Sequence, residues 1–223
     1  MKIPQSSLIV SCQSPIDSPL HDPEIIAAIA KASINQGAKG IRVDTPSHVK
    51  AVRRLLPNIP IIGLWKRYYQ GYDIYITPCF SDAVEIANAG ANIIAIDATL
   101  RNRPQGETMV NLIQKIHQEL GTLVMADVDT IENALASSKA GADYVGTTLY
   151  GYTRETESFS PPGYSLLQEM VEQLDIPIIC EGGISNPQDA KKALEYGAHS
   201  VVVGTAITGI DLKVKAFNSV FIN

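Results

Sequence analysis

Short apolar runs alternate with longer stretches of mixed polar and apolar residues along the chain. Runs of this length, bounded by glycine or polar residues, are typical of buried strands. The expected strands are Leu8–Cys12, Gly40–Val43, Ile59–Trp65, Asn92–Ile96, Leu123–Ala126, Asp143–Gly146, Ile176–Cys180 and Ser200–Val203. Their alternation with helical patterns predicts a parallel sheet, because parallel strands need a crossover between them.

The stretches between these runs carry helix start signals. Asp22-Pro23, Thr45-Pro46 and Asn186-Pro187 each place a capping side chain before a proline at the first helical position. The predicted helices span approximately residues 23–35, 46–56, 81–89, 107–120, 130–140, 163–174 and 187–196. The tail after Thr208 is expected to form a less regular eighth helix.

A Gly-Ala pair follows four of these helices, beginning at Gly37, Gly90, Gly141 and Gly197, with spacings of 53, 51 and 56 residues. Each glycine can end a helix in the left-handed conformation. A repeat of this length indicates repeated supersecondary units. An open doubly wound sheet is the alternative, but eight near-equal units in 223 residues favour a single (β/α)8, or TIM, barrel with residues 1–223 as one domain.

Charge and composition limit the classes of binding partner and the cellular location that we expect. The net charge is −5 and no basic run is present, which argues against a nucleic-acid partner. No apolar stretch approaches the ~20 residues of a membrane span, and the N-terminal residues lack the apolar core of a signal peptide. The three distant cysteines argue against a disulfide framework and favour the cytoplasm, and the four histidines lack ligand spacing, so no metal site is expected.

Polar residues at the carboxyl ends of the predicted strands are the candidates for chemistry, because barrel active sites lie at that end. These residues are Gln13, Arg42, Lys66, Asp97, Asp127, Thr147 and Glu181. Lys66 is a candidate base if desolvation and nearby cations lower its pKa; otherwise it begins a solvated loop, and either it or Arg67 must point outward. Glu181 is either a proton carrier or a cap for backbone N–H groups.

Gly182-Gly183 and Gly204-Thr205 end the last two predicted strands, where free backbone N–H groups can bind a phosphate. For Asp97 we favour a structural role, and for Asp127 a substrate contact. The aromatic loop of residues 68–78 is either an exposed turn or a wall over a polar ligand. The residues by themselves predict a phosphate-binding barrel enzyme that catalyses proton transfer. They do not distinguish an isomerase from an epimerase, a lyase or a synthase.

Several segments together resemble the N-acetylmannosamine-6-phosphate 2-epimerase (NanE) family. They include PIIGLWKR, VMADV, GADYVGTTLYGYT and EGGISNPQDAKKALEYGAHSVVVGTAIT, and the resemblance extends from about Leu8 to Thr208. It implies interconversion of N-acetylmannosamine 6-phosphate and N-acetylglucosamine 6-phosphate by proton transfer at C2, in sialic-acid breakdown. Cys180 and the tail after Thr208 depart from the family pattern, and this tail carries the last helix and any homodimer contact.

The resemblance also implies roles for individual residues. Lys66 and Glu181 are the catalytic pair, and no cofactor is implied. Gln13, Arg42 and Asp127 are implied substrate contacts, we expect Thr147 to be another, and the phosphate contacts backbone near Gly182, Gly183, Gly204 and Thr205. A related sugar-phosphate isomerase or synthase, and an inactive sugar-phosphate-binding regulator, are the competing hypotheses.

Overall fold

A computed structural model, which describes residues 1–221, shows eight parallel strands closed into a barrel. The strands follow chain order, and β8 closes the barrel by pairing with β1. They are β1 (Ser7–Cys12), β2 (Gly40–Asp44), β3 (Ile61–Leu64), β4 (Ile93–Asp97), β5 (Leu123–Asp127), β6 (Tyr144–Gly146), β7 (Ile178–Cys180) and β8 (Ser200–Val203). The predicted (β/α)8 barrel is therefore confirmed.

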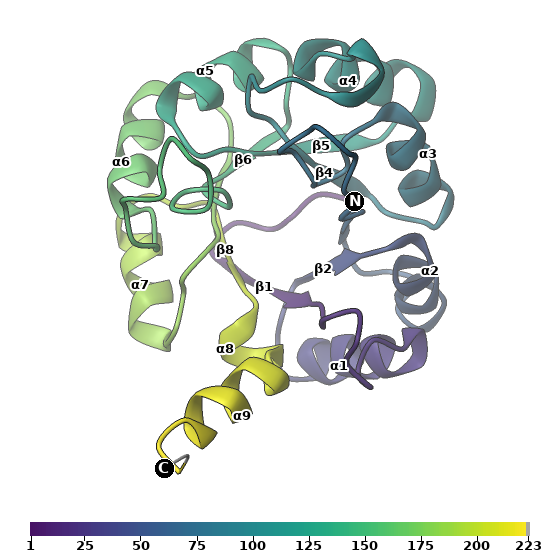
Figure 1. The fold of residues 1–223 in the computed structure, drawn as a ribbon, viewed down its shortest axis with the longest axis vertical. Helices are drawn as coiled ribbons and strands as arrows, with labels where there is room; N and C mark the ends of the chain where they lie inside the picture. The colour runs from purple at the N-terminus through teal and green to yellow at the C-terminus, as the bar shows by residue number, and fades with distance from the viewer. Residues whose placement is uncertain (222–223) are drawn as a thin grey trace.

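The helices form a ring around the strands (Figure 1). They are α1 (Pro23–Asn35), α2 (Pro46–Leu55), α3 (Phe80–Asn88), α4 (Met109–Lys115), α5 (Ile131–Lys139), α6 (Tyr164–Gln173), α7 (Pro187–Glu195), α8 (Thr205–Thr208) and α9 (Ile210–Asn218), with a short 3-10 turn η1 (Pro104–Gly106) and a π-helical turn η2 (Ile116–Leu120). The Asp22, Thr45 and Asn186 side chains cap α1, α2 and α7, as their sequence positions predicted.

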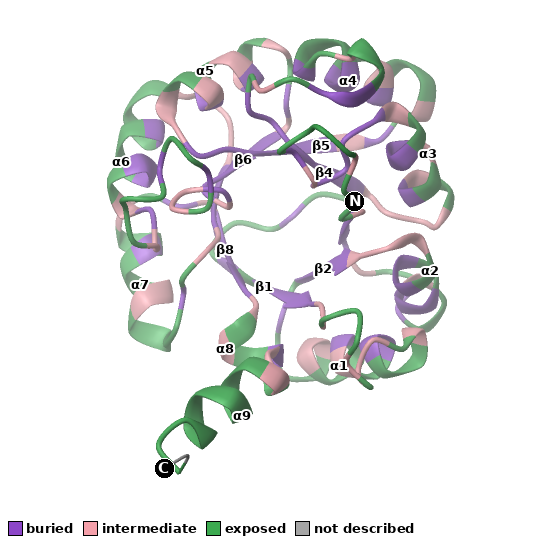
Figure 2. Ribbon diagram, viewed as in Figure 1, coloured by how far each residue is buried: buried purple, intermediate pink, exposed green. Residues whose placement is uncertain are grey.

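Strand alternation divides the apolar residues into two cores. One side chain in two points into the barrel, where Ile9, Ile62, Ile93 and Met125 belong to one buried cluster. The other side chains pack against the helices in a larger cluster. Figure 2 shows the strands buried and the outer faces of the helices exposed. The same alternation points polar side chains at the carboxyl ends of the strands toward the barrel axis.

Most predicted elements differ from the observed ones by one or two residues at their ends, and three of these differences have a local cause. The third strand is Ile61–Leu64 rather than Ile59–Trp65, since Pro60 lacks the N–H that a ladder requires. The helix expected from residue 107 begins at Met109, with Thr108 as its cap, and its last turn is the π-helical η2. The tail forms two helices, α8 and α9, because Gly209 separates them.

The last helix leaves the ring between α7 and α1 and points away from the barrel (Figure 1). None of its residues is buried. Its exposed apolar side chains are Ile210, Leu212, Val214 and Phe217. Within residues 1–221, the structure contains no helix with the length and apolar character needed to cross a membrane.

Candidate active site

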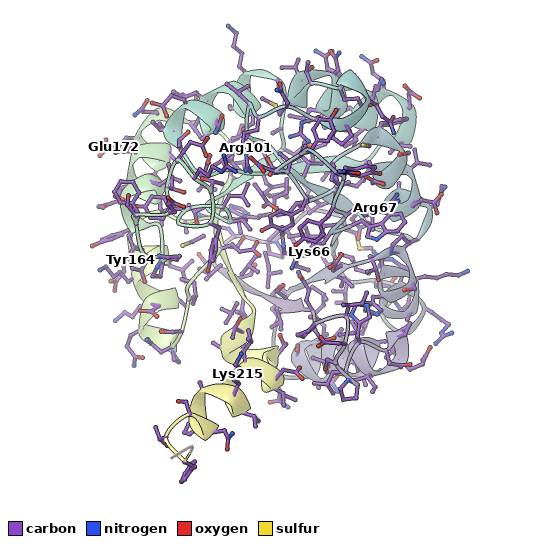
Figure 3. The ribbon with its side chains drawn as sticks, viewed as in Figure 1. Lys66, Arg67, Arg101, Tyr164, Glu172 and Lys215 are labelled. Carbon is purple, nitrogen blue, oxygen red and sulfur yellow. The ribbon has the colours of Figure 1, made fainter. Side chains whose placement is uncertain are left out.

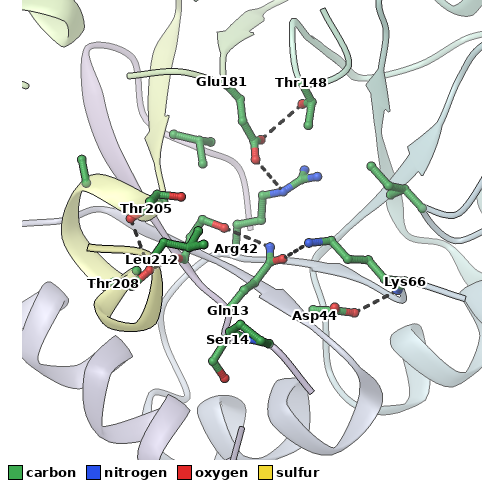
Figure 4. A pocket seen from close by; sticks show the side chains of 18 of the residues that line it. Gln13, Ser14, Arg42, Asp44, Lys66, Thr148, Glu181, Thr205, Thr208 and Leu212 are labelled. Atoms are coloured by element: carbon green, nitrogen blue, oxygen red, sulfur yellow. Dashed lines mark hydrogen bonds and ion pairs between the residues drawn. The ribbon is translucent and has the colours of Figure 1, made fainter. Parts of the chain in front are cut away.

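A cavity of about 1060 Å³ opens at the carboxyl ends of the strands. Figure 4 shows side chains from opposite sides of the barrel pointing into it. The predicted site residues that line it are Gln13, Arg42, Lys66, Glu181, Gly182, Gly183, Gly204 and Thr205. Eight of the ten predicted positions therefore surround one cavity; Asp127 and Thr147 lie outside its lining.

Lys66 follows β3 and points into the cavity, whereas Arg67 points outward (Figure 3). The Lys66 backbone N–H donates to Asp44 Oδ1 at 2.9 Å, and Lys66 Nζ donates to Gln13 Oε1 at 2.6 Å. Arg67 binds Asp82 instead, at 2.8 Å. The Lys66 side chain is exposed to the cavity, but the protein around it partly desolvates the ammonium, and this desolvation lowers the pKa of Lys66.

Arg42 forms a buried pair with Asp127 beneath the cavity. The Arg42 side chain donates to both carboxylate oxygens, at 2.6 and 3.3 Å. Burial opposes the guanidinium charge, but Asp127 and Glu181 more than compensate and raise the pKa of Arg42. Arg42 therefore supplies a fixed positive charge, with Asp127 as its counter-ion below the cavity wall.

Glu181 follows β7 and lies on the other side of Arg42. Its Oε1 is 3.0 Å from Arg42 Nε, yet this N–H does not form a well-directed hydrogen bond. Burial raises the pKa of Glu181 to about 7, against the lowering effect of Arg42. A carboxyl group with this pKa can both accept and donate a proton near neutral pH.

The two adjacent threonines have different places. Thr147 is 1% exposed, and its hydroxyl binds the backbone of Glu181, accepting from the N–H and donating to the carbonyl. Thr148 lines the cavity, and its hydroxyl lies 2.7 Å from Asp127 Oδ1 and 3.3 Å from Glu181 Oε2. Sequence reasoning missed Thr148. Strand alternation could have found it, because Tyr144, Gly146 and Thr148 share the inward face.

Two glycine turns meet at the opposite end of the cavity. Gly182 and Gly183 have φ values of 98° and 70°, in the region that favours glycine. A Cβ on Gly183 would lie 2.7 Å from the carbonyl carbon of Pro161. Gly204 precedes α8, whose first N–H groups have no partner within the helix. Backbone donors therefore converge from two strand ends, an arrangement suited to a phosphate.

The aromatic loop after Lys66 forms one wall of the cavity. Lys66 and Ile76 form an antiparallel bridge, and Tyr68 stacks on Tyr75 with ring centroids 5.5 Å apart. Tyr68 and Tyr75 line the cavity. Asp97 instead forms an ion pair with Arg101 at 2.8 Å, in the structural role favoured from sequence.

His199, for which the sequence predicted a structural role, does not line this cavity. His199 bonds the Ile3 carbonyl at the opposite end of the barrel, 3.0 Å away, which agrees with a structural role. Among residues 1–221, no group of three or more His, Cys, Asp and Glu side chains could hold a metal ion. The cavity is thus the arrangement that combines proton-carrying groups with donors for an anion.

Comparisons with known proteins match the chain to one family. A family model described as putative N-acetylmannosamine-6-phosphate epimerase matches residues 26–222. A putative N-acetylmannosamine-6-phosphate 2-epimerase of Synechococcus elongatus is 59% identical over 214 residues, covering 96% of this chain and 92% of the relative. A relative with the same description from Clostridioides difficile is 42% identical over 210 residues, covering 94% of this chain and 93% of its own.

Solved structures give the same result. The N-acetylmannosamine-6-phosphate 2-epimerase of Clostridium perfringens superposes with a TM-score of 0.93 at 39% identity, covering 98% of this chain and 94% of that one. A thiamine phosphate pyrophosphorylase of Pyrococcus furiosus superposes with a TM-score of 0.62 at 18% identity, covering 92% and 88% of the two chains, and shares the fold alone.

Proposed function

Because the chain belongs to the N-acetylmannosamine-6-phosphate epimerase family, we propose that it interconverts N-acetylmannosamine 6-phosphate and N-acetylglucosamine 6-phosphate. The whole chain, residues 1–223, acts as one barrel domain in amino-sugar breakdown. The reaction inverts C2, which lies beside the C1 carbonyl of the open-chain sugar. The C2 proton is acidic once the resulting enolate is stabilised.

One observation carries this mechanism: the two proton carriers stand on opposite sides of the barrel mouth. Lys66 follows β3 and Glu181 follows β7, four strands apart in a ring of eight. An enolate bound between them presents one face to each group. Removal of the C2 proton by one group and delivery of a proton by the other inverts the carbon.

Fixed charges and backbone donors complete the proposed site. Arg42 lies between Lys66 and Glu181 (Figure 4), where its charge stabilises the negative charge that develops on the enolate oxygen. Gln13 contacts the substrate beside Lys66, and Asp127 acts through Arg42 rather than from the cavity wall. The phosphate binds backbone N–H groups near Gly182, Gly183, Gly204 and Thr205, which form the phosphate end of the cavity.

The decisive test is proton NMR of N-acetylmannosamine 6-phosphate with the purified protein in D2O. We expect N-acetylglucosamine 6-phosphate to appear with deuterium at C2. Lys66→Ala and Glu181→Gln should each reduce turnover by about 10²-fold or more, because each removes a proton carrier. Thermal unfolding of both variants controls for loss of fold.

The same experiment separates the alternatives. Binding of the sugar phosphate without product or C2 exchange would contradict the epimerase proposal and favour a binding protein. Turnover of a different sugar phosphate in a substrate panel, with none of N-acetylmannosamine 6-phosphate, would favour another isomerase or a synthase.

We further propose that the protein is a homodimer formed through α9. This helix exposes Leu212, Val214 and Phe217, with exposed fractions of 54%, 61% and 74%. Leu8, on the outer face of β1, is also exposed. A second copy's α9 would bury both apolar surfaces.

The proposed location is the cytoplasm. Cys12, Cys79 and Cys180 are all unpaired and buried, which suits a reducing compartment. Cell fractionation with a tagged protein tests this proposal, and recovery in a secreted or membrane fraction would contradict it.

A further inference from the structure

We infer that Asp44 is a positioning residue for Lys66: its carboxylate holds the backbone of Lys66 at the barrel mouth and sets the charge that the Lys66 ammonium faces. The inference rests on the proposed role of Lys66 at C2. Asp44 is the last residue of β2 and lines the cavity, but none of the site roles proposed above includes it.

The hydrogen bond from the Lys66 N–H to the Asp44 side chain takes the place of the next backbone hydrogen bond between β2 and β3. Asp44 pairs with Leu64 in register, and the Thr45 N–H donates to the Leu64 carbonyl at 2.9 Å. Both strands end there. Beyond that point the Asp44 side chain, rather than a backbone carbonyl, accepts from the Lys66 N–H at 2.9 Å. Asp44 therefore fixes the chain at the residue that projects the ammonium into the cavity.

The backbone after Asp44 is strained in a way that fits this role. Thr45 has φ 71° and ψ 144°, a conformation that a β-branched residue rarely adopts. Such a conformation persists only where its surroundings enforce it. The turn directs the chain into α2 and leaves the Asp44 carboxylate facing Lys66, while the Thr45 hydroxyl caps the helix.

The charges around Lys66 show why the carboxylate matters beyond its hydrogen bond. Lys66 Nζ binds the neutral Gln13 side chain, and among the described residues it has no ion pair within 4.0 Å. Desolvation lowers the pKa of Lys66 most, and Asp44 leads the charges that raise it. The charged groups that act on Lys66 are Asp44, Arg42, Glu181 and Asp127. Asp44 also acts on His48, whose other titratable neighbours are His21 and Asp22.

Asp44→Asn separates the two parts of the role. Asparagine keeps an oxygen that can accept from the Lys66 N–H but removes the negative charge, so the pKa of Lys66 should fall. Asp73→Asn is the matched control, because it removes the same charge from the loop after Lys66 at a solvent-exposed position. The pH dependence of Lys66 acetylation by acetic anhydride, followed by peptide mass spectrometry, reports this pKa without requiring turnover.

We expect the acetylation midpoint of Asp44→Asn to lie about half a pH unit or more below that of the wild type, with Asp73→Asn unchanged. Asp44→Ala should lower kcat about tenfold with little change in KM, because Lys66 loses its backbone anchor, and Asp44→Asn should restore most of that loss. An unchanged midpoint in Asp44→Asn, or equal losses in both Asp44 variants without a shift, would overturn the inference.

These outcomes are distinct from those of the proposed function. If the wild type fails to exchange the C2 proton, the epimerase proposal fails whatever the acetylation midpoints are. If the wild type is active and the midpoints coincide, only the inference about Asp44 fails. Should Asp44→Ala not fold, the Asp44→Asn midpoint still decides the question.

Discussion

At the scale of single residues, the two proposed proton carriers lie in different environments. Lys66 has a neutral hydrogen-bond partner and a pKa lowered by desolvation. Glu181 has a cationic neighbour and a pKa nevertheless raised by burial. Each shift brings a group toward neutral pH from its ordinary value, which is the condition for efficient proton transfer in both directions.

The raised pKa of Glu181 predicts a stability change with pH. The pKa is about 7 in the folded protein and near the ordinary 4.5 in the unfolded chain. The folded state therefore binds this proton more tightly. Its contribution is fully present below about pH 4.5 and is lost as pH rises to about 7, costing up to about 3 kcal/mol.

Glu181→Gln removes this titration. We therefore expect the free energy of unfolding of the variant, relative to the wild type, to increase between about pH 5 and 7 and to level off above that range. Urea unfolding at several pH values measures the difference. A difference that stays constant with pH would show that Glu181 titrates at the same pH in the folded and unfolded states.

At the scale of elements, the turn after β7 depends on glycine for two separate reasons. Gly183 combines a positive φ with contact from the Pro161 backbone, whereas a Cβ on Gly182 would have no neighbour closer than 3.6 Å. The loop that carries Pro161 thus packs directly on the proposed phosphate turn. Position 183 couples this loop to the phosphate end of the cavity.

Alanine substitutions at the two glycines should consequently differ. Gly182→Ala adds backbone strain alone and should cost about 1 kcal/mol of stability, with a modest rise in KM. Gly183→Ala also forces the Pro161 backbone away, and should cost about 2–3 kcal/mol and raise KM about tenfold or more. Chemical unfolding and steady-state kinetics test the pair, and equal effects would contradict the role of the Pro161 contact.

At the scale of the whole molecule, the strands close into a barrel, but the ring of helices around them is incomplete between α7 and α1 (Figure 1). None of the residues of α9 is buried, and the outer face of β1 stays partly exposed at Leu8. The first turn of α9 also lines the cavity, through Asp211, Leu212 and Lys213. Dimerisation through α9 would therefore order one edge of the active site as well as cover apolar surface.

This arrangement predicts that Phe217→Asp dissociates the dimer, because a charge would replace an apolar side chain in the interface. Asn218→Asp adds the same charge to α9 at a polar position and should leave the dimer intact. Sedimentation velocity measures both. A wild-type protein that sediments as a monomer, or a Phe217→Asp variant that remains dimeric, would contradict assembly through α9.

The sequence by itself determined the barrel and most of the residues that line its cavity. Strand and helix periods, proline-capped helix starts and the Gly-Ala repeat are local signals, and strand ends in a parallel barrel necessarily meet at one face. Gln13, Arg42, Lys66 and Glu181 follow directly from that rule. The two glycine turns that line the cavity could be predicted from the sequence as well, since glycine marks local backbone requirements.

Only the tertiary structure decided which neighbours share a face and what each side chain contacts. A one-residue change in register reverses orientation, and so Thr148, not Thr147, lines the cavity. Asp127 lies beneath Arg42, and Asp44 binds a backbone N–H contributed by the next strand. The exposure of α9 could not be predicted from local sequence signals either. The burial of a helix depends on what packs against it rather than on the helix itself.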